Sequence, residues 1–187
     1  MPNDRKRLRG TVLSEDRRIE RFIRSLLIVL GYDSSRFTFF TAPRGQGDPK
    51  TWLRAQYPSE VNLLRRKNFQ YLCLITSCDG DNVGFVERKR EFDDHLRTAG
   101  FVARQAADRI ALPTPTWSIE TWLLFLLGDD NVDEKESSKE VFERRFRKDR
   151  DEGGAIRDAS HAWAARVLPG IRIESLLDAK IELDRID

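Results

Sequence analysis

The chain has few of the residues that build disulfides and zinc sites. Its 187 residues include two cysteines, Cys73 and Cys78, and two isolated histidines, which do not form the Cys/His spacings of a zinc motif. Both cysteines lie in or beside one apolar segment, and the alternation of a strand places them on opposite faces. We therefore expect no disulfide between them.

Long apolar runs are also missing. The longest, residues 25–30 and 122–127, are far shorter than the roughly 20 residues that a helix needs to cross a bilayer. The first residues do not show the pattern of a signal peptide. We therefore expect a cytoplasmic protein with no membrane partner.

An excess of one charge is absent too. The 33 basic and 31 acidic residues give a net charge of +2, so the chain as a whole sets up no field that attracts polyanions. The basic residues do cluster, at positions 1–10, 64–67 and 144–148. Each cluster is either a patch that binds a phosphate backbone or, more commonly, the solvated face of a helix.

What the chain does contain is an apolar segment that ends in two carboxylates. Residues 72–78 read Leu-Cys-Leu-Ile-Thr-Ser-Cys, and Asp79, a glycine and Asp81 follow. Such a segment is typical of a parallel strand, and parallel sheets bind ligands beyond the carboxyl ends of their strands. Two carboxylates there suit Mg²⁺ or Mn²⁺ beside a phosphate, although Asp-Gly-Asp is also ordinary turn chemistry.

A second acid follows another candidate strand. Residues 7–14 end at Glu15, and apolar residues at helical spacing then run from position 19 to position 30, with Gly31 as a C-cap. Glu15 therefore stands at the end of a strand and in the first turn of a helix. It either complements the helix dipole or joins the Asp79 pair at the same edge of a sheet.

A strand ending in Glu, a helix, and a later strand ending in Asp-x-Asp together resemble the TOPRIM domain. Topoisomerases, bacterial primases, small ribonucleases and the nucleases of the overcoming-lysogenization-defect type share that domain. The matching residues are Glu15, Asp79 and Asp81, and the resemblance spans about residues 7–127. It implies a Mg²⁺- or Mn²⁺-dependent phosphodiester hydrolase that cuts DNA or RNA, in a defence or mobile-element system.

Further residues are candidates for roles in the same site, the first of them by the same resemblance. Residues 112–124 look like the element in which another acid, here Glu120, opens a helix near the metal. Glu120 would bind a second cation or orient the attacking water. A basic group would offset charge on the transition state, and the candidates are Lys139 and its rival Arg44. Trp52, Trp117 and Trp122 are candidates for stacking on bases, with core packing favoured for Trp122.

The order of elements predicts the fold class. Strand and helix patterns alternate, which implies right-handed crossovers and a mostly parallel sheet. The predicted strands are 7–14, 36–41, 69–77 and 109–112, and the predicted helices after the first are 58–67, 84–98, 119–127, 137–149, 155–167 and 175–183. We therefore expect one α/β domain of TOPRIM or Rossmann-like type, with residues 128–187 as a helical C-terminal cap.

Two of these segments carry more detailed predictions. Residues 43–57, rich in glycine and proline at their start, are expected to be an insertion or a functional loop. The part that holds Arg44 and Lys50 either clamps a phosphate or covers the site, or is an ordinary surface loop. In the helix 84–98, the residues expected to be buried are Phe85, Val86, Phe92 and Leu96.

Other functions fit parts of the same pattern. Glu15-Asp16 followed by a helix resembles the acid pair of response-regulator receivers, with Asp79 as the phosphoacceptor, but no Thr and Lys end the later strands as those domains require. A TOPRIM-like module that binds without catalysis is a further alternative. No phosphate-binding loop of an ATPase occurs, so an ATPase partner would be a separate chain. The aromatic strand at 37–40 is either core or an edge that pairs with a second copy.

Overall fold

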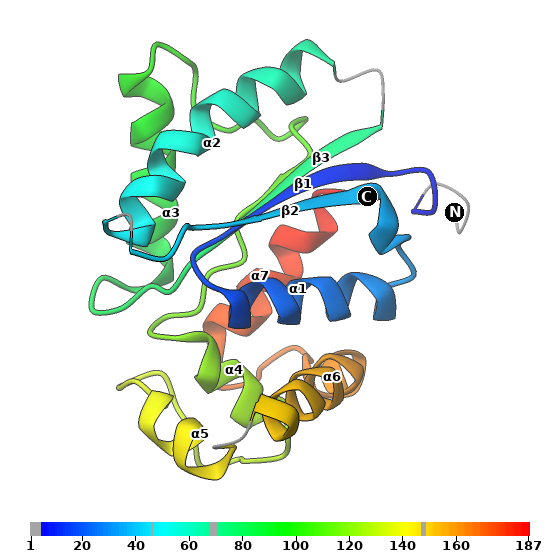
Figure 1. The fold of residues 1–187 in the computed structure, drawn as a ribbon, viewed down its shortest axis with the longest axis vertical. Coiled ribbons are helices and arrows are strands. Elements are labelled where there is room, and N and C mark those ends of the chain that lie inside the picture. Colours follow the sequence, from blue (N-terminus) through cyan, green and yellow to red (C-terminus); the bar gives the residue numbers. More distant parts are fainter. Residues whose placement is uncertain (1–4, 46, 68–70, 147–148) are drawn as a thin grey trace.

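The computed structural model describes residues 5–45, 47–67, 71–146 and 149–187. Four parallel strands form a central sheet in the order β2-β1-β3-β4 (Figure 1). They are β1 (Arg9–Ser14), β2 (Phe37–Thr41), β3 (Leu72–Ser77) and β4 (Ile110–Ala111). The prediction of a mostly parallel sheet flanked by helices is confirmed, and the arrangement is Rossmann-like. Positions 69 and 70 of the third predicted strand lie outside the described residues.

The register brings the carboxyl ends of three strands level. Ser14, the last residue of β1, pairs with Thr41 of β2 on one side and Ser77 of β3 on the other. The residues that follow these positions leave the sheet together, at what we call the carboxyl edge. Because β1 is flanked by β2 and β3, the strand order switches direction between β1 and β3, and parallel sheets bind ligands at such a point.

Helices cover both faces of the sheet. In Figure 1, α2 (Pro49–Arg66) and α3 (Gly84–Thr98) lie above it, and α1 (Arg17–Val29) and α7 (Glu174–Asp184) lie below. Two further helices, α4 (Ile119–Leu126) and α6 (Asp149–Arg166), pack against each other, and α6 also packs against α1. The C-terminal helix α6 therefore packs against the first helix of the chain.

Each face of the sheet has its own apolar cluster, and the two cysteines mark the division. Cys73 belongs to the cluster that contains residues of α1, α4, α6 and α7, whereas Cys78 belongs to the cluster of α2 and α3. Both are buried free thiols, as the alternation along the strand predicted. The predicted absence of a disulfide is therefore confirmed.

The first helix forms as its sequence predicts. Asp16 is the N-cap, and its carboxylate accepts a hydrogen bond of 2.9 Å from the Ile19 amide. The apolar residues at helical spacing are buried, from Ile19 to Leu27. Gly31 follows the end of the helix with φ +88°, a left-handed conformation that glycine adopts without strain.

The second helix corrects the prediction for residues 43–57. It starts at Pro49, not Pro58, because Asp48 caps it by accepting from the Thr51 amide at 2.8 Å and proline suits a first helical position. The helix continues through Pro58. Of the described residues of the expected loop, 43–45, 47 and 48 are non-helical, and the early start of the helix places Lys50 in the first turn of α2.

The third helix has the predicted bounds but a different buried face. Phe92 and Leu96 are buried as expected, whereas Val86 is 59% exposed. Arg88 takes the inward position instead, one helical turn before Phe92. The interpretation failed at Val86 because it assumed that the apolar residue, not the arginine, would face the sheet.

The helices after α4 have bounds that differ from the predicted ones. The helix predicted at 137–149 is α5 (Lys139–Arg145), in which Phe142 is buried and Val141 is 41% exposed. Positions 147 and 148 lie outside the described residues. Across the described part of the chain, no helix combines the length and the apolar character that crossing a membrane requires.

Candidate functional site

Glu15 and Asp79 meet at the carboxyl edge, between β1 and β3. The Glu15 amide donates to the Ser77 carbonyl at 3.1 Å, which extends the pairing of the two strands by one residue. The Asp79 amide then donates to the Glu15 carboxylate at 2.9 Å. The two acids predicted from separate motifs are therefore brought together at the switch point of the sheet.

The Asp79 carboxylate faces the start of α4. Its Oδ1 accepts a hydrogen bond of 2.9 Å from the Ile119 amide. Burial of this carboxyl group, together with the neighbouring negative charges of Glu120 and Glu15, raises the pKa of Asp79 well above its usual value. A carboxylate in this environment gains from any cation that neutralises it.

Gly80 lets the next segment approach the loop. The Gly80 amide donates to the Pro115 carbonyl at 3.0 Å, and the Asp81 amide donates to the Trp117 carbonyl at 2.9 Å. A Cβ atom at position 80 would lie 2.3 Å from the Thr116 carbonyl oxygen, closer than atoms can pack. Glycine is therefore required between the two aspartates for a steric reason.

Asp81 is fixed in an uncommon conformation beside two cations. Its φ is +51°, in the left-handed region that most residues avoid. Its carboxylate pairs with the Lys50 ammonium and lies 3.6 Å from the Arg88 guanidinium. Arg88 also donates to the Gly80 carbonyl at 3.2 Å, so the inward-facing arginine of α3 holds this loop from behind.

Lys50 joins the two halves of the acidic site. Its Nζ donates to Glu15 Oε1 at 3.0 Å and also pairs with Asp81. Burial lowers the pKa of Lys50, but the hydrogen bonds and charges of Asp81 and Glu15 outweigh it and raise the pKa overall. The sequence placed Lys50 in a segment that could clamp a phosphate but did not single it out. The signal that locates it is Asp48-Pro49, which starts the helix.

Glu120 lies deeper, behind Asp79. Its side chain is 2% exposed and pairs with Arg18, which also binds Glu152 at 3.1 Å. Only one Glu120 oxygen is used in this way, since Oε2 has no hydrogen-bond partner among the described residues. Buried carboxylate oxygens are normally satisfied, so this one has capacity for a further ligand.

The structure does not bring the other predicted basic groups to the acids. Lys139 is the exposed first residue of α5, and Arg44 lies exposed before α2. Within the described ranges, neither side chain forms an ion pair with the four carboxylates. Lys50 takes the position beside the acids that the sequence assigned to Lys139.

The three tryptophans named as candidates for stacking on bases differ in how far they are exposed. Trp122 is fully buried, and its indole nitrogen donates to the Ser175 hydroxyl at 2.7 Å, so core packing is its role. Trp52 packs partly buried against the cluster of α2 and α3. Trp117 is partly exposed and follows the segment that pairs with Gly80.

The carboxylates of the site are of the chemical type that binds a hard divalent cation. Glu15, Asp79 and Asp81 offer carboxylate oxygens, the ligands that Mg²⁺ and Mn²⁺ prefer. In the part of the chain that the structure describes, however, no three Asp, Glu, His or Cys side chains are grouped closely enough to hold a metal ion. The Lys50 ammonium occupies the space between Glu15 and Asp81, so a metal ion bound there replaces it.

No protein-family model, curated protein or solved structure matches this chain.

Proposed function

We propose that the protein is a Mg²⁺- or Mn²⁺-dependent phosphodiesterase that hydrolyses nucleic acid. The observation that carries the proposal is the contact of Glu15 with Asp79 at the switch point, where burial and the neighbouring negative charges of Glu120 and Glu15 raise the pKa of Asp79. Mutual repulsion of this kind favours a bound cation over a site without one.

Each residue has a role in this proposal. Glu15, Asp79 and Asp81 would hold the cation, which would supply Lewis-acid polarisation of the phosphate and a lowered pKa for bound water. Lys50, released from its carboxylate partners, would neutralise charge on the phosphate oxygens. The unpartnered oxygen of Glu120 orients the attacking water or contributes to a second cation site.

Arg18 and Arg88 are positioning residues. Arg18 fixes Glu120 by a buried ion pair, and Arg88 fixes the loop of Asp81 through the Gly80 carbonyl. Neither needs to touch the substrate for its effect, because catalysis of this kind depends on holding the ligands in place.

The partners belong to the same proposal. Nucleic acid is the substrate, and a separate ATPase chain in a defence or mobile-element system is the proposed protein partner. A second copy of the chain would pair through β2, which is an edge strand with Phe40 45% exposed.

The test is cleavage of supercoiled plasmid and of labelled single-stranded RNA, with Mg²⁺ or Mn²⁺. Asp79→Asn keeps the shape of the side chain and removes its charge. Asp94→Asn is the control, since Asp94 is an exposed aspartate on α3. Metal-dependent cutting that Asp79→Asn abolishes and Asp94→Asn retains is the expected result. Cutting by Asp79→Asn at the wild-type rate contradicts the proposal.

The same variants separate the alternatives. A receiver-like domain would be phosphorylated at Asp79 by acetyl phosphate and would show no cleavage. A binding module without catalysis would bind Mg²⁺ and nucleic acid but leave both substrates intact. Calorimetric titration with Mg²⁺ therefore accompanies the cleavage assay.

A further inference from the structure

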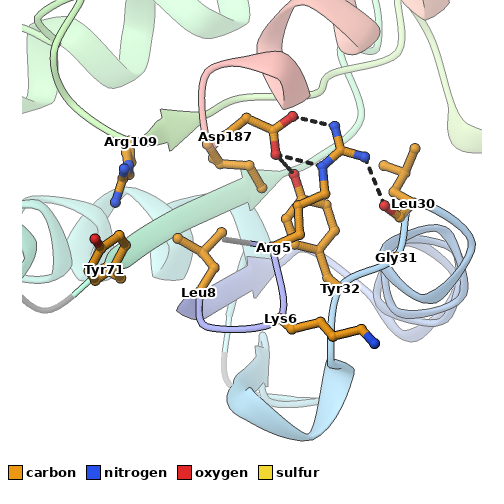
Figure 2. A pocket seen from close by; sticks show the side chains of 10 residues that line it. Arg5, Lys6, Leu8, Leu30, Gly31, Tyr32, Tyr71, Arg109 and Asp187 are labelled. Carbon is orange, nitrogen blue, oxygen red and sulfur yellow. Dashed lines mark hydrogen bonds and ion pairs between the residues drawn. The ribbon is translucent and has the colours of Figure 1, made fainter. Parts of the chain in front are cut away.

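A second site lies at the amino edge of the sheet, opposite the carboxylates. A pocket of about 590 Å³ opens there (Figure 2). Its lining comes from the segments that enter β1, β3 and β4 and from the ends of α1 and α7. This volume lies within the roughly 300–1,000 Å³ typical of small-ligand sites.

One wall of the pocket is fixed by a network around Arg5. The guanidinium donates to the Leu30 carbonyl at 2.8 Å and pairs with Asp187 through both carboxylate oxygens. The Tyr32 hydroxyl donates to the same carboxylate at 2.5 Å. Three distant segments are thus held together, and Figure 2 shows this network on one side of Leu8.

The opposite wall gathers cations around one aromatic ring. Arg109, which lines the pocket, has its guanidinium 5.4 Å from the centre of the Tyr71 ring, and the guanidinium of Arg7, outside the lining, lies 4.9 Å from the same centre. Within the described residues neither of them forms an ion pair, and the adjacent carboxylate of Asp108 is taken by Arg65 at 2.6 Å. Among the described residues, no carboxylate neutralises the positive charge of this wall, whereas Asp187 neutralises the charge of Arg5 on the other wall.

Tyr71 is held in a strained conformation at this wall. Its φ is +52°, and among the described non-glycine residues only Asp81 shares a positive φ. Its carbonyl accepts the Arg9 amide at 3.0 Å, which ties it to the start of β1. Strain of this kind persists where the surroundings enforce it, and it clusters at functional sites.

We propose that this pocket binds a nucleotide, either free or at the 5′-phosphorylated end of a strand. Arg109 would bind the phosphate through charge-assisted hydrogen bonds, and Arg7 beside the pocket would add positive charge. The ring of Tyr71, which is 37% exposed, would contact the base. A bare anion would gain nothing from this ring beyond the charges around it, which is why a nucleotide is favoured over inorganic phosphate. The proposal holds whether or not the carboxyl edge is catalytic.

Calorimetric titrations with ADP, with a short 5′-phosphorylated oligothymidylate and with inorganic phosphate test the proposal, in EDTA so that no cleavage occurs. We expect ADP, the oligonucleotide or both to bind, and inorganic phosphate to bind more weakly. Arg109→Glu should lower the affinity about tenfold to a hundredfold, the effect of a lost charged hydrogen bond. Binding of ADP alone would identify a free nucleotide as the ligand, and binding of both would include strand ends.

Three variants control the result. Arg90→Glu makes the same charge change at a 69% exposed arginine on α3 and should leave binding unchanged. Tyr71→Gly suits a positive φ and removes the ring, so it should keep the fold and weaken binding. Arg109→Gln tests the charge if the glutamate variant does not fold. Asp79→Asn should bind like the wild type, which separates this site from the proposed nuclease.

Three outcomes would overturn the proposal. The first is that wild type binds neither ADP nor the oligonucleotide. The second is that Arg90→Glu weakens binding as much as Arg109→Glu does. The third is that inorganic phosphate binds as tightly as ADP and Tyr71→Gly has no effect, because the base would then make no contact.

Discussion

The Asp79 amide donates a 2.9 Å hydrogen bond to the carboxylate of Glu15, a residue 64 positions earlier in the chain. The bond joins the ends of two adjacent parallel strands, and the pairing of Ser14 with Ser77 keeps the backbones of the two acids side by side. It also leaves the Asp79 carboxylate beside another negative charge, from which the first prediction follows.

The gain in unfolding free energy of Asp79→Asn over the wild type should increase as the pH rises. In the unfolded chain Asp79 ionises with a pKa of about 3.9, whereas in the fold its pKa is raised, first by burial and then by neighbouring carboxylates. Ionised Asp79 therefore disfavours the fold, and this penalty is absent below the unfolded pKa and grows as the pH rises towards the folded pKa. Urea denaturation of both proteins from pH 4 to 8 would show the difference widening. A difference that does not change with pH would contradict the raised pKa.

Lys50→Met should increase the affinity for Mg²⁺ about tenfold, or ~1.4 kcal/mol, while cleavage falls. The methionine keeps the apolar stem and removes the ammonium that pairs with Glu15 and Asp81, so the cation no longer displaces it. Calorimetric titration measures the affinity. Lys180→Met is the matched control, because Lys180 forms an exposed pair with Asp184 on α7. Equal or weaker Mg²⁺ binding by Lys50→Met would mean that the ammonium does not compete with the metal.

Gly80→Ala should destabilise the fold by about 2 kcal/mol. The added Cβ would meet the Thr116 carbonyl oxygen at 2.3 Å, and backbone has to move to admit it. Gly154→Ala in α6 is the control, since nothing lies within 4 Å of its added Cβ. In a helix that change should stabilise by about 0.5–1 kcal/mol. If the Thr116 carbonyl lies as close to Gly80 as described, chemical denaturation should show a lower unfolding free energy for Gly80→Ala and a higher one for Gly154→Ala.

Arg18→Ala should cost about 3 kcal/mol or more, because it leaves the buried Glu120 carboxylate without a partner. The comparison is Arg24→Ala, whose exposed pair with Glu20 lies on the same helix. Exposed pairs contribute about 0–1 kcal/mol. Equal losses in the two variants would show that the Glu120 ion pair is no stronger than a surface pair. Urea midpoints of the two variants provide the measurement.

Much of the acidic site could be predicted from the sequence, because parallel strands end at one edge. Glu15 and Asp79 each follow a strand, and the pairing of Ser14 with Ser77 brings them level. Lys50 could not be found in this way, since it reaches the acids from a helix start inside a segment rich in glycine and proline. Asp48-Pro49 was the local signal for that start.

The inward arginine shows a second limit of sequence patterns. Arg88 lies four residues before Phe92 and eight before Leu96, on the stripe that faces the core. Apolar periodicity selected Val86 because it considers only apolar residues as buried. It does not consider that an arginine can be buried when its guanidinium binds a carbonyl and a carboxylate. Glu91 is a local partner on the same helix, whereas the contact of Arg88 with the Gly80 carbonyl forms only when the loop is folded against α3.

The division of the interior by the sheet has a consequence for motion. Lys50 is carried by α2, which packs on the cluster of α2 and α3, whereas Glu120 and Arg18 belong to helices on the other face. Loosening of the α2 layer would withdraw the ammonium from Glu15 and leave the Arg18 network intact. Amide hydrogen exchange would then be faster in α2 than in α1. A Mg²⁺ ion that replaces Lys50 would increase the difference in exchange rate between α2 and α1. The exchange rates on the two faces of the sheet would therefore show whether the site is occupied.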